Sequence, residues 1–292
     1  MAGPVEKISK YKFKIGSDYR EGMRVPGIII ADDELIEHII SDNAFKQVAN
    51  VATLPGIVSA SLAMPDIHWG YGFPIGGVAA MDADSGVVSP GGVGYDINCG
   101  VRLFRSDIDA QDADEKIERL MDELYDMVPC GVGVGGRIKA SGKNLKSLLS
   151  EGAAWAVESG YGMEGDLEKT ENRGVLKRAD PEDLSEKTLN RGYDQVGTLG
   201  SGNHFAEVQR VEKIYDDDAA KAFGLRENQV CCMVHSGSRG LGHQICSEHA
   251  KSLISKMSGF GISVPDKQLA CAPIDSAEGR KYLSAMACAA NY

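Results

Sequence analysis

The stretch GGVGYDINCGVRL, Gly91 to Leu103, places four glycines around one aspartate and one cysteine and then continues into an apolar run. Asp96 and Cys99 are three residues apart, in a setting too rich in glycine to favour a helix. A carboxylate and a thiolate at this spacing can converge on one ion. The same pair also suits a turn, in which the aspartate bonds backbone N–H groups and the cysteine is buried. These two residues alone leave both interpretations open.

Outward from this stretch, the 35 glycines of the chain gather in clusters separated by short β-like runs and helical patterns. The β-like runs are Ile57–Met64, Gly76–Met81, Val101–Ser106, His204–Val211 and Gln229–His235. The helical patterns cover Asp33–Asn50, Ala113–Met127, Leu145–Ser159, Leu241–Lys256 and Ser276–Asn291. Because the two kinds of element mix without a regular βαβ rhythm, the sequence predicts an α+β fold. We expect a large mixed β-sheet core with flanking helices, in a single domain over residues 1–292.

Composition restricts the classes of protein to which the chain can belong. The formal net charge is −11, which argues against broad, non-specific binding of nucleic acid, so a nucleic-acid function requires a local basic groove. Seven cysteines without a CxxC pair argue against a disulfide framework or a structural zinc knuckle. No apolar run is long enough to span a bilayer, and the first residues lack the apolar core of a signal peptide. We therefore expect a cytoplasmic protein without a membrane partner.

Two further glycine loops favour the metal interpretation of Asp96 and Cys99. GTLGSGNHF (197–205) places His204 just before a β-like run, and VHSGSRGLGH (234–243) places His235 just after one. Strand ends that face loops are common places for sites. Three loops that deliver O, S and N ligands are consistent with one convergent site for a borderline divalent ion such as Zn²⁺ or Mn²⁺. A thiolate can also bridge two ions, and a metal pair suits in-line phosphoryl chemistry.

The same glycine loops also favour phosphate binding. Successive free N–H groups in SGNH and SGSRGLG can form an anion nest. Arg191 and Arg239 stand beside these loops, and guanidinium groups bind phosphate in a bidentate manner. For each arginine alone, a solvated surface charge is an equally good explanation. Asp66 and His68, in MPDIHWGYGFPIGG (64–77), form a weaker D-x-H signal.

Four long motifs, in this order, resemble the RtcB family of RNA-splicing ligases. They are MPDIHWGYGFPIGG, GGVGYDINCGVR, GTLGSGNHFAEVQ and HSGSRGLGHQI. The resemblance runs from about the fiftieth residue to the last. It implies the RtcB-like fold and a GTP- and Mn²⁺-dependent RNA ligase of tRNA splicing and RNA repair. Such enzymes join an RNA that ends in a 2′,3′-cyclic phosphate or 3′-phosphate to one that begins with a 5′-hydroxyl, through a guanylylated histidine. The protein partner implied is archease.

The resemblance also implies roles for individual residues. Asp96 and His204 match ligands of one manganese ion, Cys99 matches the bridging thiolate of two ions, and His235 matches a ligand of the second. Three residues match the GTP site, with Asn203 near the phosphates: Asn203, Phe205 and Glu207. Asp66 matches an acidic residue needed for ligation, and with Asn203 and Cys99 it forms the predicted catalytic group. Arg191 and Arg239 match phosphate-binding arginines of the RNA groove.

The chain departs from the family pattern in one respect. None of its six histidines fits the motif of the guanylylated nucleophile. The helical pattern before Tyr292 also has no stop signal. We therefore expect the chain to be the N-terminal portion of the family's full length, truncated at the C-terminus and inactive alone. Two alternatives are a metal-dependent phosphoesterase that uses water as nucleophile, and a non-catalytic fragment that binds RNA ends.

Overall fold

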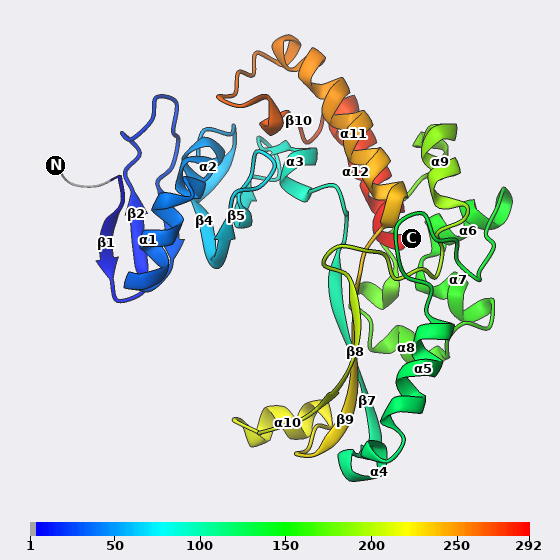
Figure 1. The fold of residues 1–292 in the computed structure, drawn as a ribbon. Coiled ribbons are helices and arrows are strands. Elements are labelled where there is room, and N and C mark those ends of the chain that lie inside the picture. Colours follow the sequence, from blue (N-terminus) through cyan, green and yellow to red (C-terminus); the bar gives the residue numbers. More distant parts are fainter. Residues whose placement is uncertain (1–3) are drawn as a thin grey trace. The chain divides into compact units, whose positions relative to one another are not determined.

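The computed structural model describes residues 4–292, which divide into two compact units. Unit 1 takes the described residues up to Tyr95, together with Arg178–Asp183 and Gln244–Ala287. Unit 2 comprises Asp96–Lys177, Leu184–His243 and Cys288–Tyr292. The α+β fold class is confirmed, because helices accompany three separate sheets of five, two and three strands (Figure 1). The single domain over residues 1–292 stays a prediction.

Unit 1 contains the five-stranded sheet, in the order β1-β2-β3-β4-β5. The sheet is mixed, since β3 and β4 run parallel and the other neighbours run antiparallel. Its strands are β1 (Glu6–Ser9), β2 (Lys12–Ile15), β3 (Gly27–Ile30), β4 (Ile57–His68) and β5 (Ile75–Met81). A second, antiparallel pair consists of β6 (Val87–Val88) and β10 (Ala272–Pro273).

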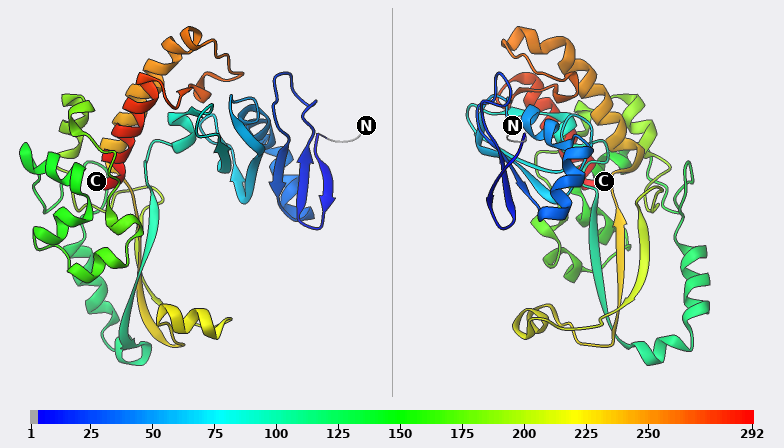
Figure 2. Two further views of the ribbon diagram at one scale, coloured as in Figure 1. Left: turned by 180° about the vertical axis from the view of Figure 1, so that it is seen from behind. Right: turned by 60° about the vertical axis from the view of Figure 1, so that its left-hand side comes forward.

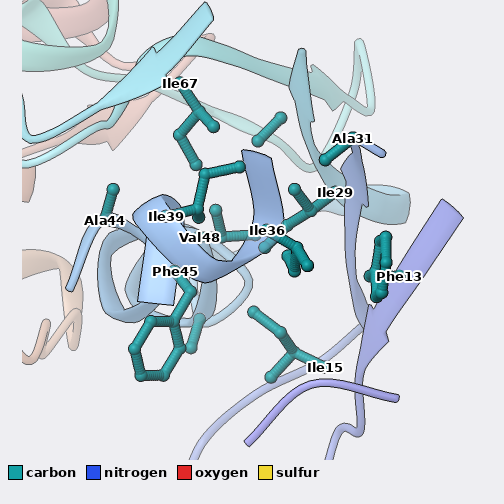
Figure 3. Close-up of a cluster of buried hydrophobic side chains, with 12 residues drawn as sticks. Phe13, Ile15, Ile29, Ala31, Ile36, Ile39, Ala44, Phe45, Val48 and Ile67 are labelled. Carbon is teal, nitrogen blue, oxygen red and sulfur yellow. The ribbon is translucent and has the colours of Figure 1, made fainter. Parts of the chain in front are cut away.

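Two short helices, α1 (Asp33–Ser41) and α2 (Ala44–Val51), pack on the five-stranded sheet. Figure 3 shows the resulting core, in which Ile36, Ile39 and Phe45 of the helices meet the strand side chains. The sequence pattern predicted one helix over this region. The pattern is interrupted at Asn43, whose φ of 63° is left-handed and cannot continue an α-helix. The Asp32 side chain caps α1 by accepting from the N–H groups of Glu34 and Leu35.

The rest of unit 1 is mostly helical. It contains α3 (Pro90–Val93), the 3₁₀ turns Pro181–Asp183, Met257–Phe260 and Lys267–Leu269, and most of the long helices α11 (Arg239–Lys256) and α12 (Ala277–Asn291). A second core cluster joins Leu54 and Ile57 to Leu253 and Met257 of the chain's later part. Within residues 4–292, no helix combines the length and the apolar character required to cross a bilayer.

Unit 2 is built on the antiparallel sheet β7-β9-β8. Its strands are β7 (Gly100–Asp109), β8 (Phe205–Arg210) and β9 (Gln229–Ser236), and they lie side by side in both views of Figure 2. The helices are α4 (Ala110–Asp114), α5 (Ile117–Met127), α6 (Lys143–Glu151), α7 (Ala153–Glu158), α8 (Glu164–Glu168), α9 (Glu186–Gly192) and α10 (Asp217–Phe223), with a 3₁₀ turn at Glu171–Gly174. Gly152, with φ of 58°, divides the predicted helix Leu145–Ser159 into α6 and α7.

Candidate metal centre

The register of the three-stranded sheet brings the ends of its strands together. Gly100, the first residue of β7, pairs with Ser236, the last residue of β9. His235 pairs with Val101 on one side and with Phe205, the first residue of β8, on the other. Cys99 and His204 directly precede β7 and β8. The three motifs therefore meet at one end of this sheet, although more than a hundred residues separate the first from the second.

The side chains of Cys99, His204 and His235 converge at this end. The Cys99 Sγ lies 3.3 Å from Nε2 of His204 and 3.0 Å from Nε2 of His235. All three potential ligand atoms lie within 4.8 Å of one another. The two imidazole rings stand edge to face, with centroids 5.4 Å apart. One sulfur and two imidazole nitrogens at these separations form a donor set that suits a borderline divalent cation.

Asp96 extends the cluster with a carboxylate. Its Oδ2 lies 2.7 Å from Nε2 of His204, and its Oδ1 accepts a 3.5 Å hydrogen bond from the Ser238 hydroxyl. The turn itself is made by backbone, because the Asp96 carbonyl accepts from the N–H of Cys99 at 3.0 Å. The turn and the convergent site are thus compatible interpretations of this aspartate.

Arg239 holds His204 from the other side of the ring. Its Nη1 lies 3.1 Å from Nδ1 of His204, and its Nε donates to the Thr198 hydroxyl at 3.3 Å. Because a guanidinium can only donate, His204 must accept at Nδ1 and carry its proton on Nε2, toward Asp96. These contacts hold the ring with Nε2 facing the sulfur. A cation at Nε2 would require the other tautomer, with the proton on Nδ1, which could then no longer accept from Arg239.

Two glycines are needed for the close packing around the cluster. A Cβ added to Gly237 would lie 2.5 Å from both carboxylate oxygens of Asp96. A Cβ added to Gly200 would lie 2.3 Å from Nδ1 of His204 and 2.4 Å from Nη1 of Arg239. Gly200 also has a φ of +116°, which residues with a side chain rarely adopt. The glycine loops therefore leave room for the polar groups to approach one another.

The environment of Cys99 disfavours its charged form in the absence of a cation. Burial raises the pKa of this thiol to about 11, and the neighbouring negative charge of Asp96 acts in the same direction. The thiol is therefore protonated at neutral pH. A bound cation reverses this preference, because thiolate is the form that binds metal.

The other predicted site residues make fewer contacts with the cluster of Cys99, His204 and His235. Phe205 packs edge to face on His235, with centroids 5.4 Å apart, and Asn203 is exposed beside it. Glu207 is exposed and accepts a 2.8 Å hydrogen bond from Gln209. Arg191 is exposed on α9, next to Gly192, whose carbonyl accepts from Tyr292. These residues all lie in unit 2.

Asp66 lies in β4 of unit 1 and is exposed, and its predicted place in the site stays a prediction. Sequence reasoning did not single out Thr198 and Ser238, which bond Arg239 and Asp96. Both lie inside quoted glycine motifs, but a hydroxyl there gives no signal that separates it from a turn residue.

Comparisons with known proteins agree with the motifs. The profile of the family described as "tRNA-splicing ligase RtcB" matches residues 47–292. The chain is 52% identical to the tRNA-splicing ligase RtcB of Archaeoglobus fulgidus over 292 residues, which is 100% of this chain and 60% of that protein. It is 50% identical to the protein of the same name from Thermococcus kodakarensis, over 99% of this chain and 60% of the relative.

A bacterial relative matches at a similar level. The RNA-splicing ligase RtcB of Mycobacterium bovis is 55% identical over 249 residues, which cover 84% of this chain and 58% of that protein. The chain thus spans about 60% of the length of these curated relatives. The matched region contains Cys99, His204 and His235, the three side chains that converge. On this agreement of motifs, geometry and similarity, the chain belongs to the RtcB family.

Proposed function

We propose that this chain forms part of a GTP- and Mn²⁺-dependent RNA ligase of tRNA splicing and RNA repair. Its substrates are an RNA that ends in a 2′,3′-cyclic phosphate or 3′-phosphate and an RNA that begins with a 5′-hydroxyl. The observation that carries the proposal is the convergence of Cys99, His204 and His235 from three glycine loops. The names of the relatives supply the reaction class.

The donor set fits manganese, since it combines imidazole nitrogen, thiolate sulfur and carboxylate oxygen around one point. In this proposal Asp96 and His204 would hold one ion, His235 would hold a second, and the Cys99 thiolate would serve both. The two cations would supply charge neutralisation at the reacting phosphate oxygens. Arg239 lies beside Nδ1 of His204, and its other guanidinium N–H groups can donate to a phosphate.

The proposed nucleotide contacts follow the same sheet. Side chains alternate along a strand, so Phe205 and Glu207 project from the face that also carries His235. Phe205 offers a ring edge or face to a base, and Glu207 can accept from the N–H groups of guanine. Asn203 donates to the GTP phosphates, and Asp66 assists ligation. An archease-type activator and a cytoplasmic location belong to the same proposal.

A chimera tests the function directly. The 292 residues are joined to the portion of the Archaeoglobus fulgidus relative that they do not match. We expect the chimera to form a covalent adduct with radiolabelled GTP and Mn²⁺ and to join RNA ends, and we expect Cys99→Ala to lose both. A folded chimera that binds Mn²⁺ but forms no adduct and joins no RNA would contradict the proposal.

The same assay separates the alternatives. A phosphoesterase would hydrolyse the RNA cyclic phosphate without GTP, and Cys99→Ala would stop this hydrolysis. A binding fragment would retain RNA ends after chelation of the metal and in Cys99→Ala. The ligase proposal predicts instead that RNA joining requires both GTP and metal.

A further inference from the structure

A concave surface of unit 2 carries two arginines and no carboxylate side chain. It is a cavity of about 280 Å³ whose lining lies at the same end of the three-stranded sheet as the metal cluster. Its polar and charged side chains belong to Asn98, Arg102, Gln195, Thr198, Ser236, Ser238, Arg239 and Tyr292. In a chain of net charge −11, an all-basic lining of this kind favours an anionic ligand.

Arg102 lies on the face of the sheet opposite to His235. The register pairs Val101 with His235 and Arg102 with Val234, and paired residues of an antiparallel sheet share a face. Gly100 and Ser236, which also line the cavity, belong to the Arg102 face. The cavity is therefore distinct from the side of the sheet on which Phe205 packs against His235. Arg239 connects the two, because it lines the cavity and also bonds His204.

The guanidinium of Arg102 is available for a ligand. Its one hydrogen bond among the described residues runs from Nη1 to the adjacent carbonyl of Val101, at 3.2 Å. The side chain is exposed and forms no ion pair with any residue from 4 to 292. Its Nε and Nη2 groups thus keep the fork of donors that matches a phosphate.

The walls beside Arg102 are held in place. Asn98 donates to the carbonyl of Ala290 at 3.1 Å, and the Tyr292 hydroxyl donates to the carbonyl of Gly192 at 2.8 Å. Asn291 bonds the carbonyl of Leu149 at 2.8 Å. These contacts fix the end of α12 against unit 2 residues. A ligand that enters the cavity therefore meets a site that is largely preformed.

A second cavity adjoins the first and adds apolar surface. It measures about 470 Å³ and shares Asn98, Arg102, Ala290 and Tyr292 with the first. Trp155, Ile138 and Val196 contribute apolar side chains to its lining, and Glu171 contributes one carboxylate. A basic cavity that continues into one with an aromatic wall matches a nucleotide unit, with its phosphate at the arginines and its base near the indole.

We propose that Arg102 holds an internal phosphodiester of the RNA strand, with the adjoining nucleotide against Trp155, next to Arg239, which the family resemblance already assigns to the RNA groove. This inference rests on the proposed RNA-ligase function and adds an RNA subsite to it. The terminal phosphate of the RNA belongs at the metal cluster. The phosphate held by Arg102 is one that the RNA reaches as it passes the ends of the β-strands. It lies toward the face of the sheet opposite to His235.

The test measures RNA binding rather than ligation. The probe is a fluorescein-labelled single-stranded RNA of about 12 nucleotides, which is long enough to fill such a groove. It is titrated with the 292-residue chain in Mn²⁺ at several salt concentrations. For Arg102→Ala we expect binding about tenfold weaker and a salt slope smaller by about 0.7, the contribution of one phosphate contact to single strands.

Arg105→Ala is the matched control. Arg105 is an arginine of the same strand, pairs with Asp107 at 3.6 Å, and lines neither cavity. We expect its affinity and salt slope to equal those of the unmodified chain. Equal affinity and slope for Arg102→Ala would overturn the inference. If the unmodified chain itself bound no RNA, the proposed function would be contradicted as well. RNA binding by the unmodified chain therefore separates a failure of the proposed function from a failure of the Arg102 inference alone.

Two further measurements identify which phosphate the cavity binds. RNAs with a 3′-phosphate and with a 3′-hydroxyl should lose the same affinity in Arg102→Ala, because the phosphodiester is internal. A loss confined to the 3′-phosphate RNA would contradict an internal phosphodiester. The sequence has two tryptophans, so Trp69→Phe leaves Trp155 as the reporter, and RNA should change its fluorescence. Inorganic phosphate that gives the same change at equal concentration would point to a free anion and overturn the assignment to RNA.

Discussion

The two larger sheets of this chain use their side chains in different ways. In the five-stranded sheet of unit 1, Ile15, Ile29 and Ala63 are fully buried beneath α1 and α2. In the three-stranded sheet of unit 2, none of the ten residues of β7 is buried. What distinguishes the second sheet is its end, where glycine loops gather Asp96, Cys99 and His235. One sheet therefore supplies stability through packing, and the other positions polar groups at its strand ends.

This difference separates the expected effects of substitution. Changes in the packed face of unit 1 should lower the free energy of unfolding and leave the affinity of folded molecules for metal unchanged. Changes at the strand ends of unit 2 should lower metal affinity with little effect on unfolding, because the polar cluster buries little apolar surface.

The largest effect is expected for His235→Ala. Removal of an imidazole that faces the Cys99 sulfur at 3.0 Å deletes a proposed ligand, so Mn²⁺ affinity should fall by more than the roughly 100-fold that loss of an outer partner produces. Isothermal titration calorimetry measures this affinity. His38→Ala, on the exposed side of α1, is the control and should bind normally. Equal affinities in the two variants would contradict the proposed ligand set.

Phe45→Ala should strongly destabilise unit 1. The side chain is 4% exposed and lies in the core between α2 and the sheet, so its loss should cost about 3–5 kcal/mol of unfolding free energy. Chemical denaturation followed by circular dichroism measures it. Phe223→Ala removes a phenylalanine that is 71% exposed and should cost little. Similar losses in both variants would show that burial does not distinguish these positions.

Gly237→Ala tests the space beside Asp96. The new Cβ would lie 2.5 Å from the carboxylate, so Asp96 must move away from His204. We expect metal affinity to fall by about 10- to 100-fold, as for other supporting groups of a metal site. Gly165→Ala is the control, since its Cβ would meet nothing within 4 Å. A Gly237→Ala variant with unchanged affinity would exclude Asp96 from the site.

The smallest effect is the change in metal affinity over a single pH unit. The pKa of the Cys99 thiol is raised to about 11 by burial and by Asp96, so metal must displace its proton at every lower pH. Above neutral pH the affinity should therefore rise about tenfold per pH unit toward that pKa. Any binding that remains in Cys99→Ala should lack this slope, and a flat profile in the unmodified chain would exclude thiolate ligation.

The sequence predicted the elements of unit 2 better than those at the start of unit 1. All five β-like runs are strands, because each is a short run with several apolar residues. The strands β1, β2 and β3 were not predicted, since each has four residues and β1 is exposed throughout. Helix breaks at Asn43 and Gly152 were also missed, because a single left-handed residue leaves the apolar period intact.

The candidate site was predictable to a different extent. The motifs named Cys99, His204 and His235, and the structure brings these three together. The position of β9 between β7 and β8 could not be predicted from the sequence, because strand order depends on contacts between residues far apart in the chain. The contact of Arg239 with Nδ1 of His204 follows from that order. Local spacing thus named the candidate donors, and only the register of the sheet supplied their geometry.

Cobalt binding tests the proposed metal site at Cys99, His204 and His235 most directly. Co²⁺ bound to a thiolate absorbs in the near ultraviolet through charge transfer from sulfur, so the spectrum reports ligation by cysteine independently of activity. We predict this band in the unmodified chain and in Cys130→Ser, whose exposed cysteine lies outside the cluster, and we predict its loss in Cys99→Ser. A band that persists in Cys99→Ser, or that is absent from the unmodified chain with Co²⁺ bound, would contradict the site.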